Sequence, residues 1–267
     1  MNTPDLVRRA VGSAARHIRQ RRLESLRRKE AETGPLGAVD YCRCCGSRNL
    51  ALQPVLWPDL IDAWHIAAYE VEYINRQQGL HCGDCHASLR SMALAVAIMR
   101  CYGYDGLFTA FMDRRSTRRL CILEINEAGQ LTQYLSRLPG HVMGSYPEVD
   151  MLALPYADRT FDLVVHSDTL EHVKQPINGL AECYRMLRPG GICAFTVPII
   201  VDRLTTSRAG LPSSYHGFPD QEQFGFQVET EYGCDAWKHV IMSGFRECRI
   251  HALEYPAAQA LTGVRRA

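Results

Sequence analysis

The stretch Asp150-Met-Leu-Ala-Leu-Pro-Tyr-Ala-Asp-Arg-Thr-Phe-Asp-Leu-Val-Val-His-Ser-Asp-Thr-Leu-Glu-His172-Val, with the helix and strand that follow it, predicts the fold of this chain. Residues 161–165 are apolar and β-branched, which is typical of a strand buried on both faces. Residues 177–187 carry apolar side chains at helical spacing and end before an Arg-Pro-Gly-Gly turn. Residues 192–197 form a second apolar run. A strand, helix and parallel strand make one right-handed crossover, so the stretch predicts an α/β fold.

Polar side chains follow the first of these strands directly. His166, Ser167, Asp168, Glu171 and His172 stand just after its carboxyl end. Open α/β sheets bind their ligands at that edge. The sequence therefore predicts a ligand site there.

The same stretch resembles the class I S-adenosylmethionine (SAM)-dependent methyltransferases, in particular those that are methyltransferase type 11-like. Its acid-x-x-x-Leu-Pro-aromatic, Phe-Asp-Leu-Val, Leu-Glu-His-Val and Leu-x-Pro-Gly-Gly elements occur in the order of that family. The resemblance implies a Rossmann-like doubly wound sheet with SAM as cofactor. It also implies that Asp150 accepts from the adenine amino group, that Met151 lies against the adenine, and that His166 and Ser167 lie beside the methionine part.

Two loops depart from the family pattern. The strand at 120–123 leads to Glu124, and the loop that is rich in glycine in the family here reads Asn126-Glu-Ala-Gly129. By the resemblance, Glu124, Asn126 and Gly129 contact the cofactor, and we expect a helix over 127–138. The strand at 141–145 ends without a plain acid for the ribose, so Ser145, Tyr146 or Glu148 would take that part.

His172 is our candidate catalytic base, because imidazole titrates nearest neutral pH. The alternative is a histidine that only packs or caps the helix start. His216 is the second candidate, and His166 a weaker rival. His216 lies in a long insertion over 199–231, and long loops without regular structure are often functional.

Two Cys-x-x-Cys pairs precede the sheet, and they contain Cys42, Cys45, Cys82 and Cys85. Four thiolates close a tetrahedral Zn²⁺ site and leave no open position, so we predict a structural zinc ion. The alternative is that these are ordinary thiols. The chain has eleven cysteines, an odd number, and six of them are scattered through apparent core elements, which favours a reducing cytoplasmic location.

Between the two pairs, Trp57, Leu60, Ile61 and Trp64 share one helical face. This face either packs against the neighbouring elements or forms an aromatic surface for the acceptor. Residues 89–102 predict an apolar helix. At the other end of the chain we expect a strand at 247–252 and a short tail.

These observations predict three parts. Residues 1–37 form a basic N-terminal helix and linker, 38–88 a four-cysteine, zinc-ribbon-like module that binds zinc, and 89–267 the methyltransferase domain. Lys and Arg total 30 against 29 Asp and Glu, so net charge gives no argument for nucleic acid. No apolar run is long enough to span a membrane. The basic N-terminus is either a solvated helix or a peripheral contact with anionic lipid or an acidic partner.

The predicted function is methyl transfer from SAM to a small-molecule or glycan acceptor, on oxygen. One alternative is a degenerate SAM-fold binding or scaffold protein, motivated by Asn126 and Ala128. Another is nucleic-acid methylation. Against the latter, residues 41–86 are not basic and the Asn-Pro-Pro-aromatic signature is absent.

Overall fold

The computed structural model describes residues 38–215 and 227–266, and these belong to one compact unit, Val39–Ala267. The basic segment 1–37 and the candidate base His216 lie outside the described residues. No helix in the described ranges has the length and apolar character needed to cross a bilayer.

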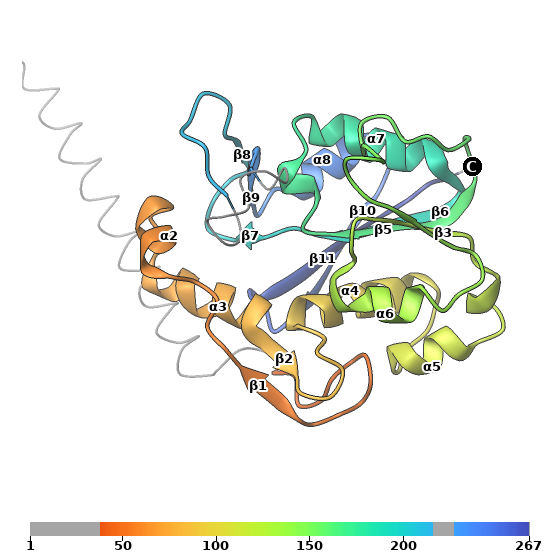
Figure 1. Ribbon diagram of the computed structural model, residues 1–267, viewed down its shortest axis with the longest axis horizontal. Helices are drawn as coiled ribbons and strands as arrows, with labels where there is room; N and C mark the ends of the chain where they lie inside the picture. Colours follow the sequence, from red (N-terminus) through yellow and green to blue (C-terminus); the bar gives the residue numbers. More distant parts are fainter. Residues whose placement is uncertain (1–37, 216–226, 267) are drawn as a thin grey trace, which may run out of the picture. The chain divides into compact units, whose positions relative to one another are not determined.

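A six-stranded sheet forms the centre of the unit (Figure 1), in the order β10-β11-β6-β5-β3-β4. Neighbouring strands from β4 to β6 run parallel, whereas β11 pairs antiparallel with both β6 and β10. The chain leaves β3 for β4 on one side and returns to β5 on the other. The strand order therefore reverses beside β3, and such a switch point is where open sheets bind ligands. The bounds are β3 Ile122–Ile125, β4 His141–Gly144, β5 Phe161–Ser167, β6 Leu187–Thr196, β10 Cys248–Leu253 and β11 Ala258–Val264.

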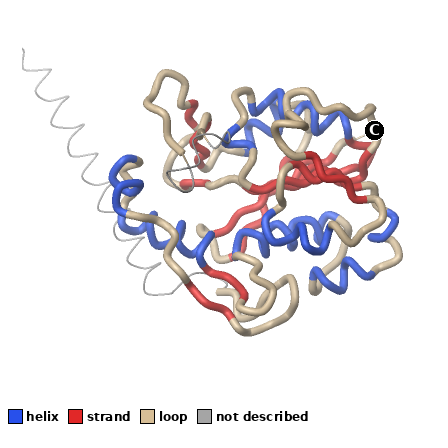
Figure 2. Tube along the Cα trace, in the orientation of Figure 1, coloured by secondary structure: helices blue, strands red, loops and turns tan. Residues whose placement is uncertain are grey.

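Helices cover both faces of this sheet (Figure 2). On one face α4 (Leu89–Cys101) and α6 (Thr132–Leu135) pack on Leu163, Val165 and Ala194. On the other, α7 (Pro176–Met186) and α8 (Trp237–Met242) pack on Val164, Cys193 and Phe195. The alternation follows from the two-residue period of a strand and confirms the predicted doubly wound architecture.

The structure corrects three details. The end of the chain is a complete hairpin, because residues 258–264 form β11 where we expected a tail. The helix expected over 127–138 is only a 3₁₀ turn at Gly129–Leu131 followed by α6. Strand β6 begins at Leu187, so the Pro-Gly-Gly segment lies within the strand instead of before it.

The cysteine-rich segment packs against α4. Strands β1 (Leu50–Leu52) and β2 (Leu80–Cys82) pair antiparallel, with α2 (Pro58–Ala63) and α3 (Ala68–Gly79) between them. Its buried residues and those of α4 belong to one hydrophobic cluster. Helix α5 (Phe108–Asp113) joins the segment through Phe108 N and Thr109 N, which donate to the carbonyls of Arg43 and Cys44.

The insertion after β6 contains a second small sheet in the order β7-β9-β8. These strands span Ile199–Ile200, Thr230–Gly233 and Thr206–Ser207 respectively. Together with η1 (Thr117–Arg119) and η3 (Leu170–His172), they complete the regular elements of the described ranges. The small sheet lies beyond the carboxyl end of β6, next to η3.

Candidate functional site

The loop after β3 has the backbone conformation of a glycine loop although it contains one glycine. Asn126 and Gly129 both have positive φ, 54° and 56°. The Asn126 side chain compensates for part of the strain, since its Oδ1 accepts from Tyr146 N at 3.0 Å. A Cβ at Gly129 would lie 2.9 Å from Ser91 Oγ, so α4 approaches the loop too closely for a larger residue. This loop can therefore bring its backbone close to a ligand.

Glu124 holds that loop from beneath. Its carboxylate is fully buried and accepts from Ala128 N at 2.7 Å and from the hydroxyl of Thr132, while His141 Nε2 lies 2.6 Å from the other oxygen. Glu124 thus positions the loop. Its predicted contact with the cofactor stays a prediction.

The first turn of α4 faces the end of β5. Arg90 on this turn forms an ion pair with Asp168, which has a positive φ of 48°. Ser91 Oγ accepts from Gln130 N at 3.3 Å, and Ser167 Oγ is 2.7 Å from Thr196 Oγ1. Sequence reasoning missed Arg90, although an arginine in the first turn of an apolar helix was a signal for it. The turn places a guanidinium beside the two strand ends.

Of the residues predicted to contact the adenosine part of the cofactor, some are exposed and one is buried. Asp150 is exposed, and its Oδ1 accepts from Leu152 N at 2.9 Å. Ser145 and Tyr146, which follow β4, are exposed as well. Met151 is buried and packs against Gly179 of α7. Its predicted contact with a bound adenine stays a prediction.

His166 does not reach the site. Its ring is fully buried on the α7 face, stacked on Phe195 with 4.8 Å between ring centroids. The thiols of Cys183 and Cys193 lie within 4.8 Å of it. A one-residue step along β5 turns a side chain to the opposite face, so Ser167 and not His166 faces α4. The structure corrects the predicted cofactor contact of His166.

His172 and Glu171 follow β5 within η3. The Nδ1 of His172 lies 3.0 Å from the carbonyl oxygen of Gln227. A carbonyl only accepts, so in the neutral ring Nδ1 carries the hydrogen and Nε2 carries the lone pair. Burial lowers the pKa of His172 from 6.5, which keeps the ring neutral at pH 7. Nε2 lies 3.8 Å from Glu171 Oε1.

The pKa values of the two acids beside His172 are both raised. Burial raises the pKa of Glu171 well above its ordinary value, and the nearby Asp168 carboxylate adds to this. Burial also raises the pKa of Asp168, although the Arg90 guanidinium opposes the shift. A neutral imidazole beside carboxyl groups with shifted pKa values is an arrangement suited to acid–base work.

A cavity of about 320 Å³ opens at these residues. Asp168, Glu171 and His172 line one side of it. The opposite wall comes from the segment between the two cysteine pairs, and includes Leu56, Trp57, Leu60, Trp64, Ile74 and Gln77. The Trp face identified in the sequence therefore lines a cavity instead of only packing.

Two arginines of the insertion hold that wall in place. Arg203 forms an ion pair with Glu70 at 2.8 Å and donates to the carbonyls of Trp64 and His65 at 2.9 Å each. Arg208 pairs with Glu231 and lies 5.3 Å from the Trp64 ring. The insertion thereby fixes one wall of the cavity, which the linear sequence did not reveal.

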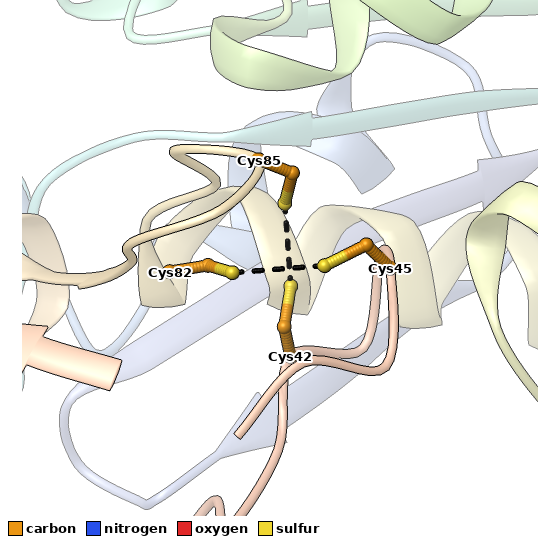
Figure 3. Close-up of side chains that lie close together, drawn as sticks. All are labelled: Cys42, Cys45, Cys82 and Cys85. Carbon is orange, nitrogen blue, oxygen red and sulfur yellow. Dashed lines mark hydrogen bonds between the residues drawn. The ribbon is translucent and has the colours of Figure 1, made fainter. Parts of the chain in front are cut away.

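The four predicted metal ligands converge (Figure 3). Their sulfur atoms all lie within 4.8 Å of one another, with 3.5 Å between Cys42 and Cys85 and 3.6 Å between Cys45 and Cys82. Zn–S bonds of about 2.3 Å in a tetrahedron place sulfur atoms about 3.8 Å apart, so this set fits Zn²⁺. Cys44 is fully buried but outside the set, and its hydrogen bond with Cys42 raises its pKa.

Comparisons with known proteins concern the sheet and the residues at its edge. Residues 102–195 match the family described as "Methyltransferase domain". A probable S-adenosylmethionine-dependent methyltransferase of Mycolicibacterium smegmatis is 36% identical over 72 residues, which cover 25% of this chain and 27% of that protein. A demethylmenaquinone methyltransferase of Clavibacter sepedonicus is 29% identical, with 49% and 66% covered. The chain thus spans from about a quarter to two thirds of the length of these two relatives.

Among solved structures, a SAM-dependent methyltransferase of Mesorhizobium loti has a TM-score of 0.33 and 15% identity, covering 55% of this chain and 91% of that one. The family match spans β3 to β6, the strands whose carboxyl ends form the site. Residues 102–195 thus match a methyltransferase domain, and the motifs within them are similar to those of the class I SAM-dependent methyltransferases.

Proposed function

We propose that this protein transfers a methyl group from SAM to an oxygen of a small-molecule or glycan acceptor. The observation that carries the proposal is His172, a neutral imidazole whose tautomer is set by Gln227 and which lines a cavity at the ligand-binding edge of the sheet. A hydroxyl must lose its proton when it is methylated, and such a ring can accept it.

The chain's own groups fit the cofactor. The positive φ at Asn126 and Gly129 lets the loop backbone approach it closely, Arg90 offers a guanidinium for its carboxylate, and Asp150 offers an exposed carboxylate for its adenine amino group. When bound, SAM supplies a methyl group activated by a sulfonium.

Methylation of a hydroxyl oxygen would release its proton, and Nε2 of His172 would accept it. Glu171 and Asp168 lie next to this ring and would orient it. The cavity walls exclude water and orient the acceptor.

We also propose a structural Zn²⁺ held by Cys42, Cys45, Cys82 and Cys85. The convergence of four thiols on a set with no open position supports this role. Eleven cysteines that are all free support a reducing, cytoplasmic location.

Calorimetric titration with SAM tests the enzyme proposal. Saturable binding is expected, and Asp150→Ala should weaken it about tenfold, which is about 1.4 kcal/mol for one charged hydrogen bond. Asp113→Ala is the control, because Asp113 is an exposed residue of α5. Absence of heat at millimolar SAM would favour a scaffold protein with a degenerate cofactor loop.

A further inference from the structure

The cavity beside His172 contains polar atoms that the protein leaves unpaired. Within the described residues, Gln77 Nε2, both carboxyl oxygens of Glu171 and Asp168 Oδ1 are buried without a hydrogen-bond partner. Gln77 and Glu171 are each only 1% exposed. A buried polar group without a partner costs about 1–3 kcal/mol, so several around one cavity indicate a ligand that pairs with them.

These atoms require both donors and acceptors from the ligand. The Gln77 amide nitrogen only donates, whereas an ionised carboxylate only accepts and a protonated one does both. A hydroxyl can donate and accept. A ligand with one hydroxyl would leave some of these atoms unpaired, but a ring with several adjacent hydroxyls would satisfy them together.

The opposite wall is aromatic and apolar. Trp57 is 38% exposed, and Leu60 and Trp64 lie beside it. Arg203 and Arg208 hold this wall through the contacts described above, so its shape is set before a ligand arrives. A surface of this kind suits the C–H face of a saturated ring whose polar groups lie at its edge.

The size and charge of the cavity further limit the class of ligand that it can bind. Its volume of about 320 Å³ is near the lower limit for small-molecule sites, so it accommodates a single ring with its substituents. Asp168 and Glu171 disfavour an anionic ring. Asp168 already forms an ion pair with Arg90, so a cationic ring would gain little there.

We propose that this cavity binds a neutral pyranose, so that the acceptor is a hydroxyl of a glycan or glycoside. Gln77 and Glu171 pair with the hydroxyls, and Trp57 contacts the apolar face. The methyl-transfer part rests on the proposed function above, whereas the binding of the sugar ring does not require the cofactor.

The test uses the fluorescence of Trp57 and Trp64 in the full chain carrying Trp237→Phe, which removes the only other tryptophan. Trp237 lies on α8, away from the cavity lining. The probes are methyl pyranosides of gluco, galacto, manno and 6-deoxy-manno configuration, with phenol and cyclohexanol as ligands that have one hydroxyl. At least one pyranoside should give a saturable change at millimolar concentration and bind more tightly than either control.

Two variants locate the binding. Gln77→Leu should weaken the pyranoside at least tenfold, whereas Gln53→Leu, at an exposed position of the same segment, should not. Trp57→Ala, measured by the fluorescence of Trp64, should also weaken pyranoside binding. This variant removes only an exposed side chain.

No response to any pyranoside up to 100 mM, or tighter binding of phenol that is unaffected by Gln77→Leu, overturns the inference. SAM titration on the same samples separates the two claims. Loss of SAM binding contradicts the proposed function alone, and loss of pyranoside binding with SAM binding intact contradicts the sugar site alone.

Discussion

Arg203→Met should loosen the aromatic wall of the cavity and destabilise the protein. The guanidinium donates to the carbonyls of Trp64 and His65, just after α2, and pairs with Glu70, whose side chain is only 4% exposed. Without Arg203, the Glu70 carboxylate keeps its contact with Ala67 N at 2.8 Å but has lost its counter-charge.

The burial of the Arg203–Glu70 pair gives the size of the expected loss in the free energy of unfolding. Removal of one partner of a buried pair costs about 3–5 kcal/mol, and since Arg203 is 29% exposed, water can replace part of its interaction. We therefore expect the free energy of unfolding to fall by about 2–3 kcal/mol. Glu70→Gln combined with Arg203→Met should lose less than Arg203→Met alone, because no unpaired charge then stays buried.

Urea unfolding at 25 °C measures these differences, and with a slope of about 2–3 kcal/mol per molar the midpoint should move by about 1 M. The control is Arg118→Met. Arg118 and Asp113 form an ion pair whose side chains are 61% and 78% exposed, so its loss should cost about 0–1 kcal/mol. Pyranoside binding should weaken in Arg203→Met while SAM binding stays the same.

Equal destabilisation by Arg203→Met and Arg118→Met, within about 0.5 kcal/mol, would refute this account. A double variant that is less stable than Arg203→Met would do so as well. Either result would mean that the acceptor wall is held by packing alone.

Three further predictions concern the site and the metal. Because burial lowers the pKa of His172 from 6.5, the acid limb of the kcat–pH profile should lie below pH 6.5, and a limb above pH 6.5 would exclude this base. His172→Asn should lower kcat by about 10²–10⁴ with SAM affinity unchanged. Burial and Asp168 raise the pKa of Glu171 above 4.5, so the native state holds more protons than the unfolded state in that interval and loses stability as pH rises. Glu171→Gln should therefore become more stable relative to wild type between pH 5 and pH 8 in urea unfolding, and an equal difference at both pH values would contradict the shift. Purified protein should contain about one equivalent of zinc, and less than about half an equivalent would count against the site. Both a strong chelator and Cys82→Ser should lower Tm, whereas Cys234→Ser, which changes an exposed thiol, should not.

Local patterns were sufficient for much of the fold. The apolar runs of β5 and β6 and the periodicity of α7 predicted the crossover, because burial on both faces requires such runs wherever the strands lie. The Cys-x-x-Cys spacing likewise predicted four converging thiols, because each pair brings two sulfur atoms to one turn. In contrast, strand β11 was missed. Its Ala-Gln-Ala-Leu-Thr-Gly-Val sequence has weak strand character, and its place between β6 and β10 supplies the hydrogen bonds that make it a strand.

The sequence identified only some of the residues of the candidate site. His172 and Asp150 stand in recognisable motifs, and sequence alone identified them. Whether a side chain on a strand faces α4 or α7 depends on its place in the strand's two-residue alternation, and this placed His166 on the α7 face.

The sequence by itself determined the fold class and predicted the resemblance to methyltransferases and the four converging cysteines, since each depends on residues close together in the chain. Only the tertiary structure brought Gln77 and Glu171 to one cavity and Arg203 to the segment that forms its aromatic wall, because these residues come from three segments far apart in the sequence. The unpaired polar atoms of Gln77 and Glu171 point to a ligand only because the fold brings them to the same cavity.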